Sequence, residues 1–390
     1  MFAASRTARH RAIRPVCDVL EGRALLSAMM VPPMQVPGGA EFASFPQPQG
    51  FHGPIVPNLP AKPNASISTV PSNGDVNPYG VAFVPEHFPS GGLLHPGDVL
   101  VSNFNNSDNV QGTGTTIVQI QPGSGQQSLF FTSKEPGLST ALGVLQGGFV
   151  LVGNAPTPDG TLAHMGPGSL QVIDRFGHQV LNLTDPKLLQ GVWDLTVNDH
   201  GPFAQVFVSN ALTGAVTRID LLVQTRQDTV HVLDMTQIAS GYAHVANSAA
   251  VVLAPTGLAF DARTDTLYVA STGDNAIYAV RNAAITQTDH GKGTLVFNDP
   301  NHLNGPLGLA LAPNGDLLTT NGDAFNPNSS VPPSELIEFT PAGHFVGQLQ
   351  LDPAVGAAFG LAIRFDDGRL TLATVNDDTN SLDLRTITQH

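Results

Sequence analysis

Charged residues and cysteine are both scarce in this sequence of 390 residues. Charged residues make up 12% of the chain, about half the share that is usual in soluble proteins. The only cysteine is Cys17, so the chain beyond it has no disulfide, no thiol nucleophile and no cysteine-ligated metal site. No apolar run reaches the ~18 residues that a membrane-spanning helix needs, and we expect no transmembrane segment.

Catalytic signatures are also absent. The sequence contains no G-x-S-x-G elbow, no H-E-x-x-H pair, no P-loop and no EF-hand loop. Glutamate is rare beyond the N-terminus, where it occurs only at positions 41, 86, 135, 335 and 338. These absences favour a non-catalytic protein over an enzyme.

The few charges are unevenly distributed along the chain. The first 28 residues contain five arginines, whereas the chain from Met29 onward has 12 basic and 29 acidic residues. A body this acidic repels phosphate backbones, which excludes nucleic acid as an expected partner. Binding of a cation is compatible with the same charge.

Glycine and proline are plentiful, with 40 and 31 residues. Many short strands joined by turns produce such a composition. A short signature recurs through the chain: a small or proline-containing turn, an anchor residue that is usually glycine, and then an apolar strand. The six anchors are Gly80, Gly143, Asp194, Gly257, Gly308 and Gly360.

The anchors lie 51–63 residues apart, and five of them begin a unit of four expected strands. Units of this kind are the mark of a propeller, in which every sheet buries both faces by packing radially against its neighbours. The sixth unit lacks a fourth strand, and the stretch 66–70 just ahead of the first anchor supplies one. The sequence therefore predicts an all-β, six-bladed β-propeller over residues 64–390, with four-stranded blades and a ring closed by the N-terminal strand.

Two stretches of this body resemble the core of NHL/TolB-like six-bladed propellers. They are Leu267–Ile277 and Gly308–Leu317. The resemblance extends over residues 65–390 as a pattern, and it implies a fold more than a function. Several six-bladed relatives are lactonases or esterases that hold one Ca²⁺ in the channel through a glutamate and through asparagine and aspartate residues. Here no glutamate begins a first strand.

The N-terminus resembles an export motif. After the basic stretch, Val19–Ala28 is similar to the LEPR-xLL motif on predicted exported proteins of planctomycete-type bacteria, with Gly22 in place of its proline. The resemblance implies export or sorting to the cell surface. We divide the chain into a basic leader (1–28), a Pro/Gly-rich linker (29–63) and the propeller (64–390), and we expect a monomer.

Polar residues end the second strand of every unit, where we expect them to form a rim at the channel mouth. These rim residues are Asn103, Asn154, Asn210, Ser271, Asn321 and Asn376. Their oxygens suit sugar hydroxyls or Ca²⁺, but asparagine also ends strands because its amide satisfies turn backbone groups.

Three functions remain open from the sequence. The leading one is a secreted or cell-surface binding scaffold that takes a protein partner or a polysaccharide on its Asn/Asp-rich face. The alternative is a Ca²⁺-dependent lactonase or esterase with the metal in the central channel. A structural module of the cell envelope is the third. Trp193, which opens the third unit, is expected to pack between blades.

Overall fold

The structure, a computed structural model, describes residues 51–322 and 332–389. The expected leader (1–28) and most of the expected linker lie outside the described residues. Within them, the chain forms six four-stranded antiparallel sheets and one two-stranded sheet. The prediction of a six-bladed, all-β propeller is confirmed, and helix is limited to two short 3₁₀ turns, η1 (Val56–Asn58) and η2 (Leu162–His164).

The blades are numbered along the chain, and each runs from its inner to its outer strand. Blade 1 consists of β2 (Val76–Phe83), β3 (Val99–Asn105), β4 (Thr116–Gln121) and β5 (Gln126–Thr132). Blade 2 consists of β6 (Leu138–Leu145), β7 (Phe149–Asn154), β8 (Ser169–Asp174) and β9 (Gln179–Leu183). Blade 3 consists of β10 (Val192–Asp199), β11 (Phe203–Asn210), β12 (Ala215–Gln224) and β13 (Thr229–Ala239).

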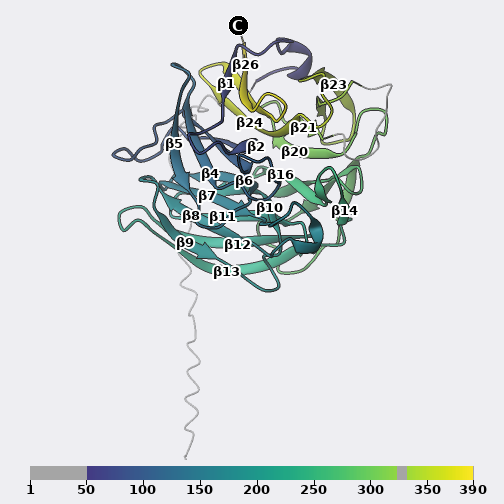
Figure 1. Cartoon of the computed structure of the whole chain (residues 1–390). Helices are drawn as coiled ribbons and strands as arrows, with labels where there is room; N and C mark the ends of the chain where they lie inside the picture. The colour runs from purple at the N-terminus through teal and green to yellow at the C-terminus, as the bar shows by residue number, and fades with distance from the viewer. Residues whose placement is uncertain (1–50, 323–331, 390) are drawn as a thin grey trace, which may run out of the picture. The chain divides into compact units, whose positions relative to one another are not determined.

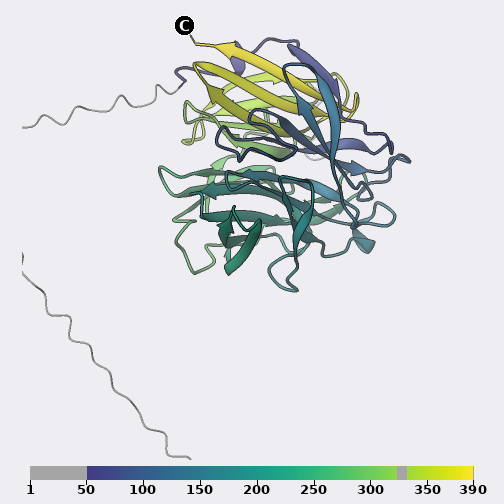
Figure 2. The ribbon, with the colours of Figure 1, turned by 90° about the vertical axis from the view of Figure 1, so that its left-hand side faces the viewer.

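Blades 4 to 6 follow the same order, and an extra hairpin precedes blade 4. The hairpin consists of β14 (Val245–Asn247) and β15 (Val251–Leu253), and blade 4 consists of β16 (Pro255–Asp261), β17 (Thr266–Ser271), β18 (Ala276–Arg281) and β19 (Thr294–Phe297). Blade 5 consists of β20 (Pro306–Leu311), β21 (Leu317–Asn321), β22 (Glu335–Phe339) and β23 (Phe345–Gln350). Blade 6 consists of β24 (Ala358–Asp366), β25 (Arg369–Asn376), β26 (Ser381–Thr388) and β1 (Ala65–Ser68). The inner strands surround the axis in Figure 1, and Figure 2 shows the blades from the side as separate sheets.

The N-terminal strand closes the ring. β1 pairs antiparallel with β26, with Ile67 opposite Leu382, and the two labels lie together in Figure 1. Two backbone bonds extend the pairing at its ends: the Asn64 amide donates to the Leu384 carbonyl at 2.7 Å and the Thr69 amide to the Asn380 carbonyl at 2.9 Å. The strand borrowed from just ahead of the first anchor therefore completes blade 6, which would otherwise have three strands.

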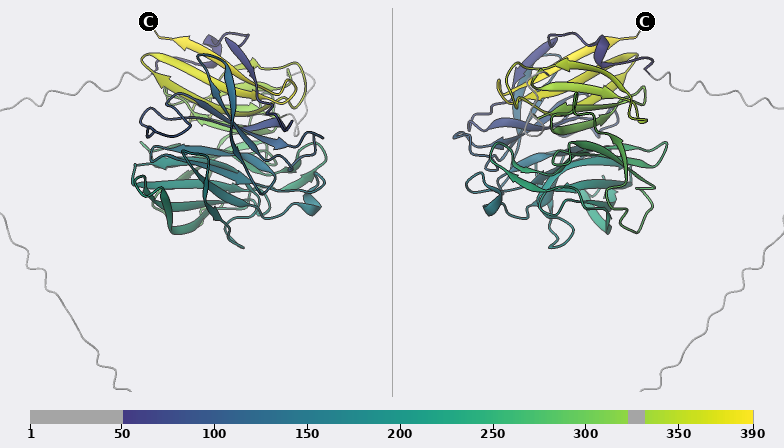
Figure 3. Two further views of the ribbon diagram at one scale, coloured as in Figure 1. Left: turned by 60° about the vertical axis from the view of Figure 1, so that its left-hand side comes forward. Right: turned by 90° about the vertical axis from the view of Figure 1, so that its right-hand side faces the viewer.

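Residues 51–63 pack on the propeller, although the sequence analysis placed them in the linker. Phe51, Ile55, Val56 and Leu59 are buried in an apolar cluster with residues of blades 5 and 6, and η1 lies against β22 and β23. The carboxylate of Glu338 accepts the Ile55 and Val56 amides at 2.7–2.9 Å. This segment is the purple stretch beside the yellow blade in Figure 3.

In five of the six blades the anchor residue marks a bulge in the inner strand. In blade 1 the pairing with the second strand shifts between Pro78 and Val81, and each of the other inner strands has a register shift at the same place. A bulge brings the backbone close to the next inner strand. At Gly80, an added Cβ would lie only 2.8 Å from Cβ of Leu142, which explains the recurring glycine.

The anchor of the second unit is misplaced in the sequence analysis. In blade 2 the shift spans three residues, between Leu138 and Leu142, so that Ala141 occupies the anchor position. Gly143 lies two residues further along and pairs with Leu151. The bulge of β6 contains one residue more than the other five, and the glycine pattern alone cannot show this.

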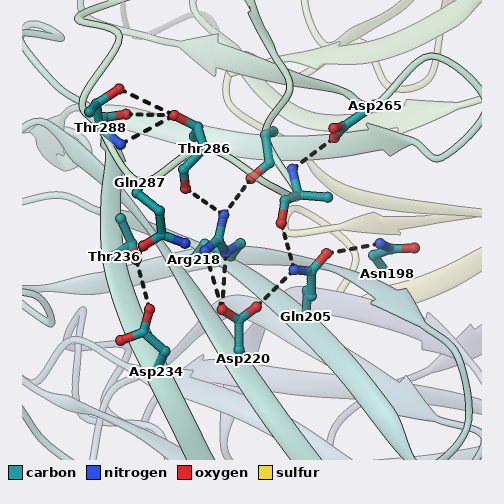
Figure 4. Close-up of polar contacts among 12 residues, drawn as sticks. Asn198, Gln205, Arg218, Asp220, Asp234, Thr236, Asp265, Thr286, Gln287 and Thr288 are labelled. Atoms are coloured by element: carbon teal, nitrogen blue, oxygen red, sulfur yellow. Dashed lines mark hydrogen bonds and ion pairs between the residues drawn. The ribbon is translucent and has the colours of Figure 1, made fainter. Parts of the chain in front are cut away.

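A buried arginine joins blade 3 to blade 4 (Figure 4). The guanidinium of Arg218 pairs with Asp220 at 3.2 Å and donates to the carbonyls of Ala283 and Thr286 at 3.1 and 2.7 Å. Gln205 donates to both Asp220 and the Ala284 carbonyl at 2.8 Å. The arginine is 1% exposed, so its charge is satisfied entirely by these partners.

Candidate functional site

The six rim residues lie where the sequence analysis placed them, each at or near the end of a second strand, but all are buried. Their side chains bond within their own blade, to the segment that leads into its inner strand or to the adjoining turn. These bonds involve Asn103 with Thr69, Asn154 with Pro136, Asn210 with Gln190, Ser271 with Asp274, Asn321 with His302 and Asn376 with Asp352. Each rim residue thus links two segments of its own blade, and we call such a residue a clamp. The role of the rim in binding stays a prediction.

Asn154 illustrates how completely such a clamp is engaged. Its Nδ2 donates to the Pro136 carbonyl at 3.2 Å, and its Oδ1 accepts from the amide and the hydroxyl of Ser169 at 2.5 and 3.0 Å. The side chain therefore links the entry to blade 2 with the start of β8. An amide with these partners stabilises the fold and has little left to offer a ligand.

Replacing Asn154 by alanine is expected to cost about 2–3 kcal/mol, because the buried Ser169 amide loses its partner. Asn298→Ala, at an exposed position, is the matched control and should change stability by less than about 0.5 kcal/mol. Urea unfolding followed by circular dichroism measures both. Equal midpoints for the two variants would remove the structural role assigned to the rim.

A cavity of about 230 Å³ lies at the channel mouth, on the side where the inner strands begin. We call it the mouth cavity. Its lining includes the polar residues Asn77 and Asp377 and the aromatic residues Tyr79, Trp193 and Phe359. The β14–β15 hairpin forms another wall through Ala249 to Leu253, and Gln111 of blade 1 donates to the Ala249 carbonyl at 2.9 Å. This bond links the hairpin to blade 1.

Aromatic side chains form the floor of the mouth cavity. The residue just before the anchor is aromatic in blades 1, 3 and 6, as Tyr79, Trp193 and Phe359. The ring of Tyr79 lies 4.5 Å from that of Phe359, 6.0 Å from that of Trp193 and 4.7 Å from that of Phe104 behind it. Trp193 packs among these residues as the sequence predicted, and it also lines the cavity.

Two buried polar atoms of residues that line this cavity have no hydrogen-bond partner among the described residues. They are Oδ1 of Asn77 and Nε1 of Trp193, whose residues are 4% and 1% exposed. Buried polar groups are nearly always paired in native structures, so each unpaired one calls for an explanation. An unpaired acceptor and an unpaired donor therefore belong to residues that line one cavity.

Asp377 adds a carboxyl group to the mouth cavity. Burial, followed by the charge of Asp378, raises the pKa of the Asp377 carboxyl to about 6. Burial, and secondarily the nearby Asp377 carboxylate, raises the pKa of Tyr79 far above its usual range. Asp377 is therefore ionised at neutral pH and faces a phenol that stays neutral.

Five other acids follow the second strands in the sequence, namely Asp108, Asp159, Asp274, Asp323 and Asp378. Those that the structure describes are not part of the cavity lining. Asp159 pairs with His164 at 2.6 Å, and Asp274 pairs with Lys292 at 2.7 Å. Asp108 and Asp378 are exposed, and Asp323 lies outside the described residues. Asp377 is thus the acid of this set that contributes to the cavity.

Asp194 occupies the anchor position of blade 3, where four other blades have glycine. Its carboxylate accepts from the Leu195 amide at 2.7 Å. Burial raises the pKa of the Asp194 carboxyl well above its ordinary value. Burial accounts for the rise in pKa, which the hydrogen bond from the Leu195 amide opposes.

The remainder of the channel is apolar. Beyond the anchors, a cavity of about 340 Å³ is lined by residues of all six inner strands, among them Val81, Leu142, Leu195, Leu258, Leu309 and Leu361. Thr196 is the only residue of that lining with a polar side chain. Across residues 51–322 and 332–389, no group of three His, Cys, Asp or Glu side chains could hold a metal ion. The lining of this part of the channel thus contains no carboxylate for a Ca²⁺ ion.

Comparison with known proteins shows the fold. No family model matches the sequence, and neither does any curated protein. Among solved structures, the chain is similar to a luciferin-regenerating enzyme at 10% identity, with a TM-score of 0.50 over 83% of this chain and 95% of that one. It is also similar to the calcium-binding protein regucalcin of Agrobacterium tumefaciens at 14% identity, with a TM-score of 0.50 over 84% and 95%.

These likenesses define the class of protein as a six-bladed β-propeller. At such low identity they show the architecture and leave activity to the site. The closer resemblance to NHL/TolB-like propellers stays a prediction, and the export motif lies outside the described residues. In the part of the chain that the structure describes, no helix has the length and apolarity that crossing a membrane requires.

Proposed function

We propose that this chain is a non-catalytic binding propeller that takes up one side chain of a protein partner in the mouth cavity. The observation that supports this most directly is the pair of unpartnered buried atoms, Asn77 Oδ1 and Trp193 Nε1, on residues that line an aromatic-floored cavity. Ligand sites are commonly concave and mostly apolar, with a few polar groups that fix orientation.

A protein side chain suits the mouth cavity better than a polysaccharide does. Sugar rings stack on broad aromatic faces at an open surface, whereas Tyr79 and Trp193 line a small cavity. The cavity volume of about 230 Å³ accommodates one side chain and does not extend along a glycan. The rim amides, which would have met sugar hydroxyls, bond inside the blades.

The Ca²⁺-dependent hydrolase remains the second candidate only through the fold shared with the regucalcin structure. In that case Ca²⁺ would bind in the channel and a lactone or ester would be hydrolysed. The apolar channel and the scattered carboxyls favour the binding function.

We extend the proposal to a secreted or cell-surface location on the basis of the N-terminal motif. Fractionation of the producing cells, with the protein detected in each fraction by an antiserum, tests that location.

Trp193 provides a direct assay, because it is the only tryptophan of the chain and lines the cavity. We expect at least one Nα-acetyl amino-acid methylamide, from a panel of Lys, Arg, Leu, norleucine, Phe, Asn and Glu derivatives, to change its fluorescence saturably. The Kd for so small a probe is expected to be on the order of 1 mM. Chito- and cello-oligosaccharides should leave the emission unchanged.

Two results would count against this proposal. If no capped amino acid produced a saturable change while an oligosaccharide did, the site would belong to a glycan-binding protein. If the protein hydrolysed a γ-lactone or an aryl ester in the presence of Ca²⁺ with multiple turnovers, the hydrolase would replace it.

A further inference from the structure

The carboxylate of Asp377 is half-buried and has no polar partner in the part of the chain that the structure describes. Its backbone amide donates to the Ala357 carbonyl at 2.9 Å, but its carboxylate has neither a hydrogen-bond donor nor a cation beside it among the described residues. By contrast, Lys292 donates to Asp274 at 2.7 Å, and Asn376 donates to Asp352 at 2.8 Å. The structure thus leaves one half-buried negative charge open, at the mouth cavity.

The groups around this carboxylate favour a positive charge. Tyr79 and Phe359 form an aromatic floor with ring centroids 4.5 Å apart, and aromatic faces attract cations. Oδ1 of Asn77 is an additional acceptor without a donor. The acidic body of the chain adds a long-range attraction for cations.

Other classes of occupant fit less well. An anion would meet the carboxylate of Asp377 and the negative body. A metal ion would find only one carboxylate in this lining, and no group of three His, Cys, Asp or Glu side chains gathers in the described ranges. A neutral apolar group would seal an unpaired carboxylate away from water, which is costly. A guanidinium has five donors in a rigid fork, two more than the three acceptor oxygens of Asp377 and Asn77.

We propose that the mouth cavity binds an organic ammonium group, with Asp377 as its counter-ion, Asn77 Oδ1 as a further acceptor and the Tyr79–Phe359 floor against its alkyl chain. Resting on the proposed function, this identifies the occupant as a lysine side chain of the protein partner. The indole N–H of Trp193 is then left for an acceptor on the same partner, because an ammonium group offers only donors.

The test is a fluorescence titration of the full-length protein at pH 7.5 with Nα-acetyl-lysine methylamide and with its uncharged counterparts, the norleucine and Nε-acetyl-lysine derivatives. The lysine derivative is expected to bind at least about tenfold more tightly than either, because only it neutralises the buried carboxylate. Asp377→Asn should remove this preference. Asp378→Asn, at the exposed neighbouring position, should change the affinity by less than about twofold.

The pH dependence provides an independent readout. The groups facing Asp377 are the phenol of Tyr79 on β2 and the exposed Asp378. With the pKa of Asp377 at about 6, the lysine derivative should lose affinity about tenfold per pH unit below that value. In the Asp377→Asn variant the affinity should be flat between pH 5 and 7.5.

The outcomes separate this inference from the proposed function. Tighter binding of norleucine than of lysine would leave the binding function intact and overturn the cation. Lysine binding that is unchanged in Asp377→Asn would overturn the assigned counter-ion. No saturable signal from any probe would overturn both. The Asp377→Asn variant should fold, because the ionised carboxylate of Asp377 destabilises the folded protein. The raised pKa contributes stability to the folded state that is complete below the unfolded-state pKa of the carboxyl and is lost as the pH rises through about 6.

Discussion

Deletion of residues 1–70 is expected to abolish cooperative folding of the propeller. The deletion removes β1, which pairs with β26, and with it the buried side chains of Phe51, Ile55, Val56 and Leu59. Each such side chain contributes about 1.5–3 kcal/mol, and together they approach the 5–15 kcal/mol that holds a typical domain folded. Scanning calorimetry should show no unfolding peak, or one at a much lower temperature.

A matched pair of point variants isolates the closing strand itself. Ile67 is half-buried on β1 and packs in the cluster shared by blades 1 and 6, whereas Ser66 is exposed on the same strand. Ile67→Asp is expected to cost about 2–3 kcal/mol, because it places a charge against apolar side chains. Ser66→Asp should cost less than about 0.5 kcal/mol. If the two variants had the same free energy of unfolding, β1 would not close the ring.

Replacement of Arg218 by methionine is expected to lower the free energy of unfolding by about 3–5 kcal/mol. The change removes the ion pair to Asp220 and the bonds to two carbonyls of the 283–286 segment. Those carbonyls and the aspartate would then lose a buried partner. Urea unfolding measured at two wavelengths, with the calorimetric enthalpy as a check, gives the loss.

Arg226→Met is the control for this variant, since Arg226 is exposed on the turn that follows β12. It should change stability by less than about 0.5 kcal/mol. The double variant Arg218→Met/Asp220→Leu should recover part of the loss, because no unpaired charge then remains buried. A single variant as stable as the wild type would mean that Arg218 does not join the two blades.

The sequence predicted the architecture well because a propeller repeats its signals. Six anchors, four strands per unit and one missing strand were enough to predict both the blade count and the closure by the segment around Ile67. Blade 2 was harder, since its bulge moves the anchor position from Gly143 to Ala141. The packing of Phe51 and Ile55 was not predicted, because a Pro/Gly-rich stretch shows no strand or helix period.

The site was predicted less well, for a physical reason. Asn154 and its counterparts end strands as expected, but a sequence does not show whether an amide faces solvent or a backbone group of its own blade. The residues that line the mouth cavity are far apart in the sequence and come from several blades and from the β14–β15 hairpin. The usable signal was the aromatic residue before three of the anchors: Tyr79, Trp193 and Phe359.

The most direct test of the account is a crystal structure of the protein grown with Nα-acetyl-lysine methylamide at pH 7.5. We predict that the lysine Nζ lies about 3 Å from the carboxylate of Asp377, with its alkyl chain over Tyr79 and the clamp bonds of Asn154 unchanged. A ligand bound at the Asn103–Asn376 rim, or a mouth cavity that stays empty while the ligand occupies another surface, would contradict it.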